Sequence, residues 1–281
     1  MSGFSVDWLS LREPVDHRST NPAVRAAFVR DFGTRDMLRI TDLGSGTGSH
    51  LRSLAPHLGM RQAWRLVDYD PRLLASARSI LSAWAEEARD IDDRLLLRRG
   101  AQTIDVEFVE ADLVGGLDAL LDRPTDAVTS AALFDLVSGE FIQRLAAAMA
   151  TAKLPLYAIL SYDGHSKWSP PHEADADMLD AFHQHQGRDK GFGPAAGPRA
   201  ADLLGAAFAQ HGFAVTSGPS PWLLTQPHRQ LIGDLAEGIA QAVTETGSVD
   251  VGRVSNWLDA RREAKACEIG HRDIYARHVG E

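Results

Sequence analysis

The chain of 281 residues is 44% hydrophobic and 24% charged, which is the composition of a globular protein rather than a disordered one. Its formal net charge of −9 argues against a nucleic-acid partner, whose phosphates favour a basic protein face. No run of about 18 apolar residues predicts a membrane-spanning helix or a membrane partner, and residues 1–10 lack the basic and apolar parts of a signal peptide.

Short apolar runs alternate along the chain with stretches of helical spacing. Residues 1–36 predict an N-terminal helical cap, with a helix beginning at Pro22. Strands are predicted over 37–43, 63–67, 104–109, 127–133, 156–160 and 213–216, with 94–99 as a local hairpin partner. Helices are predicted near 51–58, 71–84, 139–152, 198–210, 228–245 and 250–266, before the closing segment 270–278.

This alternation predicts an α/β fold, doubly wound around a mostly parallel sheet. We divide the chain into the cap (1–36), a ligand-binding core (37–226) and a C-terminal helical elaboration of the same domain (227–281). A long insertion after the fifth strand (163–197), rich in Gly, Pro, His and Asp, is expected to form a lid. Ligands in such sheets bind outside the carboxyl ends of the strands, so we expect the site there.

Two weaker signals concern the setting of the protein. The single cysteine, Cys267, cannot form an internal disulfide, which fits a reducing cytoplasm. Arginine outnumbers lysine and alanine is abundant, which indicates a GC-rich bacterial gene.

A glycine-rich loop follows the first predicted strand. Glycines in the segment Asp42-Leu-Gly-Ser-Gly-Thr-Gly48 permit a tight turn and a close approach to a ligand. Asp68 ends the second predicted strand, where a carboxylate that faces solvent can accept both hydroxyls of a ribose. A plain strand–helix turn is the alternative. The G-x-G-x-x-G fingerprint of dinucleotide sites would need glycine at Ser49, which disfavours NAD.

On these residues the sequence resembles the class I S-adenosylmethionine-dependent methyltransferases, over about residues 37–217. The resemblance implies that Asp42 lies near the methionine end of S-adenosylmethionine, that Asp68 binds the ribose and that Tyr69 packs on the adenine. It also implies that Asp112 faces the adenine amino group. The implied cofactor-binding residues are Asp42, Gly44, Ser45, Gly46, Gly48, Asp68, Tyr69, Asp112 and Leu113.

Three acidic segments also have structural interpretations. Asp70 precedes Pro71 and is expected to cap a helix. Asp112 is either a turn residue or a cofactor contact. Residues 12–16 either cover the cofactor, as N-terminal segments often do in the family, or begin a surface helix at Pro14.

The acceptor side of the sequence favours a small molecule. Family enzymes that methylate the exocyclic amines of bases, or glutamine, carry an Asn/Asp-Pro-Pro-Tyr type motif after the fourth strand. This chain has Ala131-Ala-Leu-Phe-Asp135 there, and oxygen and nitrogen acceptors both stay open. Asp135 and Asp163 resemble the divalent-metal site of catechol-type O-methyltransferases, but the expected Asp-Asn pair is Asp163-Gly164 here, which disfavours a metal.

We expect the acceptor to lie between the carboxylates of Asp135 and Asp163, under the insertion. The candidate catalytic residues are Asp135, Asp163, His183 and His185. The candidate substrate-binding residues are Arg12, Phe134, Tyr162, Trp168, Lys190 and Phe192. The acids could instead cap helices and the histidines could be solvated. The alternative functions are a regulatory protein that binds S-adenosylmethionine or S-adenosylhomocysteine without turnover and, less favoured, a dinucleotide-dependent oxidoreductase; the oligomeric state stays open.

Overall fold

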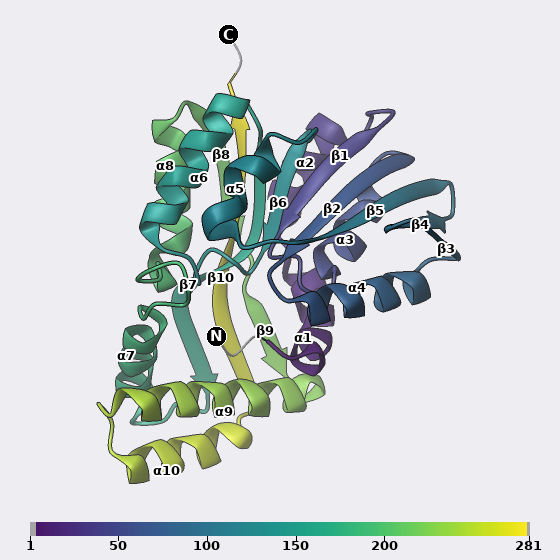
Figure 1. The fold of residues 1–281 in the computed structure, drawn as a ribbon. Helices are drawn as coiled ribbons and strands as arrows, with labels where there is room; N and C mark the ends of the chain where they lie inside the picture. The colour runs from purple at the N-terminus through teal and green to yellow at the C-terminus, as the bar shows by residue number, and fades with distance from the viewer. Residues whose placement is uncertain (1–3, 280–281) are drawn as a thin grey trace.

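The computed structural model describes residues 4–279, which form one ten-stranded sheet with helices on both faces (Figure 1). Five parallel strands make its centre: β1 (Leu38–Leu43), β2 (Arg61–Asp68), β5 (Gln102–Glu110), β6 (Ala127–Ala131) and β7 (Leu156–Ser169). The strand order is β3-β4-β5-β2-β1-β6-β7-β10-β8, with β9 paired to β10. The prediction of a doubly wound, mostly parallel α/β fold is confirmed.

The remaining strands lie at the two sides of this parallel centre. The hairpin β3 (Glu87–Ile91) and β4 (Arg94–Arg99) extends the sheet beyond β5, and the pairing of β4 with β5 was predicted. On the other side, β10 (Ala266–His278) runs antiparallel to both β7 and β8 (Phe213–Pro219). The short strand β9 (Trp222–Thr225) pairs with the first residues of β10.

Helices cover both faces because each presents an apolar stripe to the sheet. One face carries α2 (Pro22–Phe32), α3 (Ser49–Leu54) and α4 (Pro71–Trp84), and the other carries α5 (Leu113–Leu121), α6 (Gly139–Ala152) and α8 (Ala200–Gln210). In α4, for example, Leu74, Ala77 and Leu81 recur at helical spacing and are buried. Asp70 caps this helix through the Arg72 N–H, as predicted. None of the helices within residues 4–279 has the length and apolarity needed to cross a bilayer.

Two segments differ from the sequence-based expectation. The fifth strand was predicted to end at 160, but β7 continues to Ser169, so the insertion does not begin as a loop at Asp163. The segment 227–281 was expected to be helical, yet only α9 (Arg229–Thr246) and α10 (Val251–Arg262) are. Its last part forms β10, which lies between β7 and β8 and is part of the core sheet.

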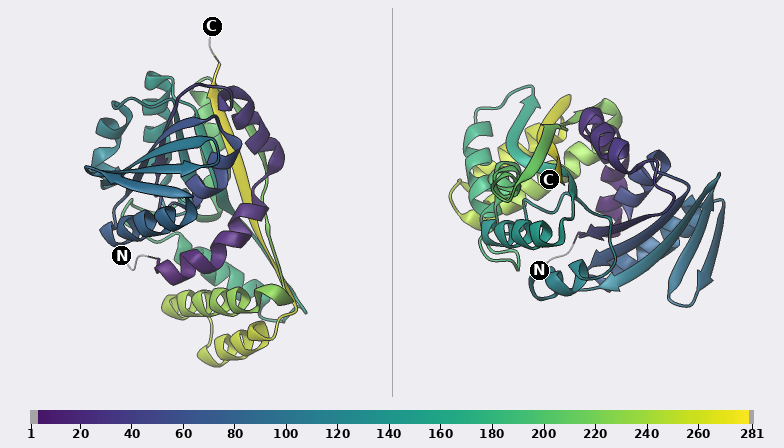
Figure 2. Two further views of the ribbon diagram at one scale, coloured as in Figure 1. Left: turned by 90° about the vertical axis from the view of Figure 1, so that its right-hand side faces the viewer. Right: turned by 90° about the horizontal axis from the view of Figure 1, so that it is seen from above.

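The long strands β7 and β10 carry a second group of helices below the main sheet (Figure 1). There α7 (Asp175–Gln186) packs against α9, and α9 against α10. Trp168 of β7 meets Trp257 of α10 edge to face, with ring centroids 5.6 Å apart. The N-terminal helix α1 (Val6–Ser19) lies between the sheet and these helices (Figure 2).

Two irregularities in the β7–β10 pairing place His271 opposite Tyr162. At the first, the Asp163 carboxylate packs against Gly270 and accepts the His165 N–H at 3.0 Å. At the second, Asp273 is fully buried and accepts the N–H groups of Leu160 at 2.9 Å and Asn21 at 2.7 Å. Bulges of this kind redirect side chains, and here they flank His271 in the middle of β10.

Candidate active site

The predicted glycine loop joins β1 to α3 at the carboxyl edge of the sheet. Gly44, Gly46 and Gly48 have φ angles of +65°, +52° and +74°, in the left-handed region that favours glycine. A Cβ at Gly48 would come within 3.3 Å of the Leu66 side chain, so this glycine also allows close packing against β2. The loop is held to β2 by the Ser45 N–H, which donates to the Val67 carbonyl at 2.9 Å.

Asp68 lies beside this loop, at the end of β2. Its Oδ2 accepts the Gly46 N–H at 2.8 Å and its Oδ1 accepts the Asp70 N–H at 3.0 Å. The expectation that this carboxylate faces solvent is wrong: Asp68 is 6% exposed, and burial raises its pKa. The following residue, Tyr69, is 46% exposed, so its ring is free to pack on a ligand. The strand end therefore offers a carboxylate and an aromatic face next to the loop.

Asp42 lies at the start of the loop and is almost completely buried. Its Oδ1 accepts a hydrogen bond from the Thr129 hydroxyl at 2.7 Å and lies 3.3 Å from Nδ1 of His50. Its Oδ2 is buried without a hydrogen-bond partner among the described residues. A buried carboxylate oxygen without a partner is costly, and a cationic ligand group such as the ammonium of S-adenosylmethionine would satisfy it. This arrangement fits the implied cofactor.

The acid after β5 has a different local role. Asp112 is exposed and caps α5 by accepting the Val114 N–H at 2.9 Å, while Leu113 is buried against that face of the sheet. Asp112 was expected to be a turn residue or a cofactor contact, and the structure makes it the N-cap of α5. A contact between Asp112 and adenine stays a prediction.

Helix α1 covers the glycine loop. A Cβ at Gly46 would lie 3.4 Å from Cδ1 of Leu9. Two contacts hold α1 on α3: Arg52 forms a bidentate ion pair with Glu13, and Nε2 of His17 lies 2.9 Å from the Ser49 hydroxyl. The N-terminal segment therefore lies across the candidate cofactor site.

Beside the loop, six side chains from six parts of the fold come together, and we call them the acceptor cluster. They come from α1, the turn after β6, β7, α7, β9 and β10, and they are Arg12, Asp135, Tyr162, His183, Trp222 and His271. Four of them were predicted as site residues. Trp222 and His271 were not, because neither stands in a recognisable motif and only the pairing of β9 and β10 brings them to the site.

Arg12 is fixed on one side of the acceptor cluster. Its Nε donates to Asp16 at 2.8 Å, and its guanidinium lies over the Trp222 ring, 5.1 Å from the centroid. The Trp222 indole N–H donates to the same Asp16 at 2.9 Å. Asp16 thus holds both side chains, and the positive charge of Arg12 lowers the pKa of both Asp135 and His271 against or alongside the effect of burial.

The two histidines and Tyr162 line the other side. The Tyr162 hydroxyl and Nε2 of His183 are 3.0 Å apart, and the His271 ring lies 6.2 Å from that of Tyr162 and 5.1 Å from that of Trp222. Burial, aided by Arg12, lowers the pKa of His271 to about 3, and burial also lowers the pKa of His183. Nδ1 of His271 is buried with no hydrogen-bond partner in the part of the chain described here. Both imidazoles are therefore neutral at pH 7.

Asp135 follows β6 and does not cap α6, whose N-cap is Ser138. Burial raises the pKa of its carboxyl to about 6, with Arg12 acting in the opposite direction. A carboxyl with such a pKa accepts and releases protons near neutral pH, which is what a general base requires.

This raised pKa predicts how stability depends on pH. The folded protein binds the Asp135 proton more tightly than an unfolded chain, whose Asp pKa is about 3.9, so Asp135 costs stability as pH rises from about 4 to 6. At pH 8 we expect Asp135→Asn to unfold at a higher urea concentration than the parent. Its free energy of unfolding should be higher by about 1–3 kcal/mol. The difference should shrink towards pH 4, and a difference that does not change with pH would contradict the prediction.

The structure does not bring the other predicted residues to the acceptor cluster. Asp163 turns onto Gly270 of its own strand pair, and His185 points away from His183 to Glu245, 2.9 Å from its carboxylate. Trp168 packs with Trp257 in the lower group of helices. Phe134 is buried in the core on the α6 face of the sheet. Lys190 and Phe192 lie in the loop after α7, where Phe192 packs against Phe141 of α6. Within residues 4–279, no three His, Cys, Asp or Glu side chains are grouped to hold a metal ion.

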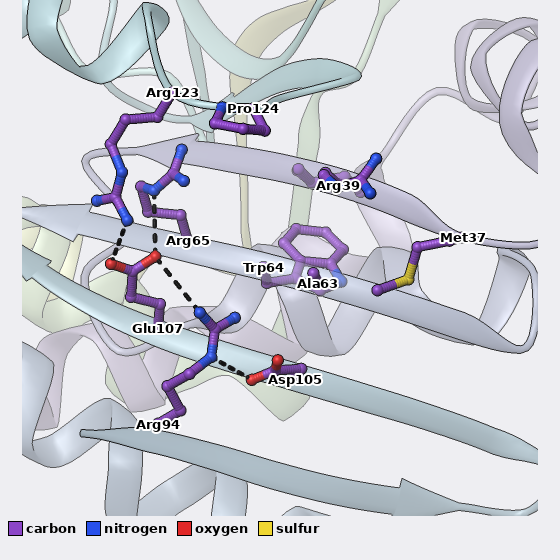
Figure 3. A pocket seen from close by; sticks show the side chains of 11 residues that line it. Met37, Arg39, Ala63, Trp64, Arg65, Arg94, Asp105, Glu107, Arg123 and Pro124 are labelled. Atoms are coloured by element: carbon purple, nitrogen blue, oxygen red, sulfur yellow. Dashed lines mark hydrogen bonds and ion pairs between the residues drawn. The ribbon is translucent and has the colours of Figure 1, made fainter. Parts of the chain in front are cut away.

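A separate hollow of about 460 Å³ lies on the sheet face beyond α5 (Figure 3). Its lining comes from β1, β2, β4, β5 and the segment after α5, and it includes no residue of the glycine loop. Glu107 is one of its lining residues and pairs with Arg65 at 3.3 Å, Arg123 at 2.6 Å and Arg94 at 4.0 Å (Figure 3). Because these charges satisfy one another, we assign the hollow a structural role.

That assignment predicts two results for Glu107→Ala. Loss of the shared carboxylate leaves Arg65, which is largely buried, without its ionic partner, and should lower the free energy of unfolding by about 1–2 kcal/mol. The increase in melting temperature caused by S-adenosylhomocysteine should be unchanged. A variant of full stability that no longer responds to S-adenosylhomocysteine would place the nucleoside site in this hollow instead.

Comparisons with known proteins bear on the fold. No protein-family model matches the chain, and no curated protein sequence matches it. Among solved structures, the chain is similar to a cyclopropane-fatty-acyl-phospholipid synthase-like protein from Lactobacillus casei, with a TM-score of 0.54, 17% identity and coverage of 96% of this chain and 94% of that one. It is also similar to the YcgJ protein of Bacillus subtilis, with a TM-score of 0.50, 10% identity and coverage of 93% and 100%. The chain therefore has the Rossmann-like fold of the class I methyltransferases.

Proposed function

We propose that this protein transfers a methyl group from S-adenosylmethionine to a small-molecule acceptor. The observation that carries the proposal is the group around the glycine loop: three left-handed glycines, the Asp68 carboxylate bonded to the loop, and the unpartnered Oδ2 of Asp42. The loop supplies backbone N–H groups, Asp68 suits ribose hydroxyls, and Asp42 suits an ammonium. The same sheet edge carries the acceptor cluster, so donor and acceptor would meet there.

The bound cofactor supplies an electrophilic methyl group, and the side chains of this chain have to orient the acceptor and take its proton. Positioning alone supplies about 7–11 kcal/mol of the barrier reduction in such reactions, and a general base adds about 10²–10⁴-fold. Arg12, Trp222 and His271 form the positioning side of the cluster, and Asp135 and the Tyr162–His183 pair form the side that accepts a proton. A small acceptor agrees with the net charge of −9, which disfavours nucleic acid.

A thermal-shift comparison tests the cofactor. S-adenosylhomocysteine at 100 times its Kd adds about 2.7 kcal/mol to stability and should raise the melting temperature clearly, whereas NAD should not. Stabilisation by NAD alone would overturn the proposal in favour of an oxidoreductase. Transfer of a labelled methyl group to any of a panel of small acceptors then separates an enzyme from a regulatory protein that only binds the nucleoside.

A further inference from the structure

Resting on the proposed function, we propose that the acceptor atom is an acidic oxygen, of a phenol-type hydroxyl or a carboxyl group, and that Arg12 and His271 bind it. The proposal names the substrate class and two residues for it. It follows from where charge lies in the acceptor cluster, from the hydrogen-bonding capacity left unused there, and from the strength of the bases present.

The unused hydrogen-bonding capacity belongs to His271. This side chain is 7% exposed, and its Nδ1 has no partner within the described residues. The two bulges of the β7–β10 pair hold the ring between Tyr162 and Trp222, so the imidazole is fixed in place by the sheet itself. A buried neutral imidazole whose Nδ1 has no partner fits a ligand that brings a hydrogen-bonding oxygen.

The charges in the cluster match an acceptor that gives its proton to Asp135 and becomes an anion beside Arg12. Arg12 is permanently positive, and it lies close enough to His271 and Asp135 to lower the pKa of both. Its partner Asp16 is already bonded to Arg12 and to the Trp222 N–H, so it is not free to neutralise a second cation. Once Asp135 has taken the acceptor's proton, the oxyanion lies beside the guanidinium and a neutral carboxyl, whereas an ammonium acceptor would lie beside the guanidinium.

The bases in the cluster are weak, so they can take a proton only from an acceptor group that is itself fairly acidic. Asp135 has a pKa of about 6, and burial places the pKa of His183 below its ordinary value. Taking a proton from a hydroxyl as weakly acidic as water, with a pKa of about 15.7, would be uphill by roughly ten pKa units. Proton transfer from a phenol, with a pKa of about 10, is uphill by roughly four pKa units, and transfer from a carboxylic acid is almost level. Aromatic rings of Trp222, Tyr162 and Phe182 stand nearby and suit a flat apolar body.

The step balances as follows. The acceptor O–H bond breaks and its proton passes to the Asp135 carboxylate, while Arg12 and His271 hold the resulting oxyanion. The oxyanion attacks the methyl carbon, an O–CH₃ bond forms, and the S–CH₃ bond breaks with its electron pair staying on sulfur. The sulfonium becomes a neutral thioether, and Asp135 returns its proton to water.

The experiment uses the full chain saturated with S-adenosylhomocysteine and 4-nitrophenol as the probe, because its phenolate absorbs visible light. At pH 6 we expect bound 4-nitrophenol to show the phenolate band and to bind at least tenfold more tightly than benzylamine or benzyl alcohol. Arg12→Gln and His271→Asn should each weaken 4-nitrophenol binding at least tenfold. Arg18→Gln on α1 and His278→Asn on β10 are matched controls outside the cluster and should bind as the parent does.

The thermal shift with S-adenosylhomocysteine keeps two failures apart. If that shift is absent, the proposed function fails. If the shift is present in the parent and in Arg12→Gln and His271→Asn, the variants are folded and bind the nucleoside. Their binding of 4-nitrophenol then tests the acceptor proposal alone. Equal or tighter binding of benzylamine or benzyl alcohol, no binding of 4-nitrophenol, or unchanged binding in both variants would overturn the acidic-oxygen proposal.

Discussion

Gly46→Val should abolish the binding of S-adenosylhomocysteine, seen as the loss of its thermal shift. Gly46 has a φ of +52°, which a β-branched residue adopts only with strain. The added side chain would also project towards Leu9 of α1, into the space between the loop and the helix that covers it. Both effects act at the point where a cofactor has to approach the backbone.

Gly100→Val separates the two effects. Gly100, in the turn between β4 and β5, has a similar φ of +58°, but a Cβ there would meet nothing within 4 Å. We expect this variant to lose stability from strain and to keep its response to S-adenosylhomocysteine. If Gly46→Val still binds S-adenosylhomocysteine with the affinity of the parent, the glycine loop is not the cofactor site.

Asp68→Asn should weaken the binding of S-adenosylhomocysteine strongly in calorimetry, and Asp68→Ala should weaken it further. Hydrogen bonds from ribose hydroxyls to a carboxylate contribute about 1.5–3 kcal/mol each, and the amide loses the charge that makes them strong. Because Asp68 also accepts the N–H groups of Gly46 and Asp70, the alanine variant should in addition lose stability through the loop.

Asp70→Asn is the control for this local disturbance. Asp70 caps α4 next to Asp68 and pairs with Arg72, so its loss perturbs the same turn without removing the proposed ribose ligand. We expect it to lower stability slightly and to leave the affinity for S-adenosylhomocysteine within about twofold, since the capping effect belongs to the helix. Unchanged affinity in Asp68→Asn would contradict the assignment of the ribose site.

The local patterns in the sequence predicted the centre of the fold well. The strands around residues 38–43 and 61–68 are apolar runs bounded by turn residues, and the glycine loop and the Asp70 cap are signals confined to a few neighbouring residues. Such signals do not depend on distant parts of the chain, and for that reason they survive in the structure.

What the sequence did not reveal depends on pairing between distant segments. Residues 266–278 contain Gly270, Asp273 and several charges, so the alternation expected of a strand is broken by the two bulges. The second half of β7 was not predicted because the residues after Leu160 are mostly polar. They form a strand because β10, far away in the sequence, pairs with them. His271 and Trp222 reach the acceptor cluster only through these pairings. Asp163, in contrast, accepts a backbone hydrogen bond at a bulge, and His185 pairs with Glu245.

The extension of β7 and β10 beyond the parallel sheet has a consequence for entropy. Tyr162 and His271 stand on neighbouring strands, and α7, which carries His183, is packed against α9 at the end of those same strands. Three walls of the acceptor cluster therefore keep their relative positions before any ligand arrives, and little conformational freedom is lost there on binding. Such a preformed site would discriminate between ligands by shape and charge rather than by closing around them.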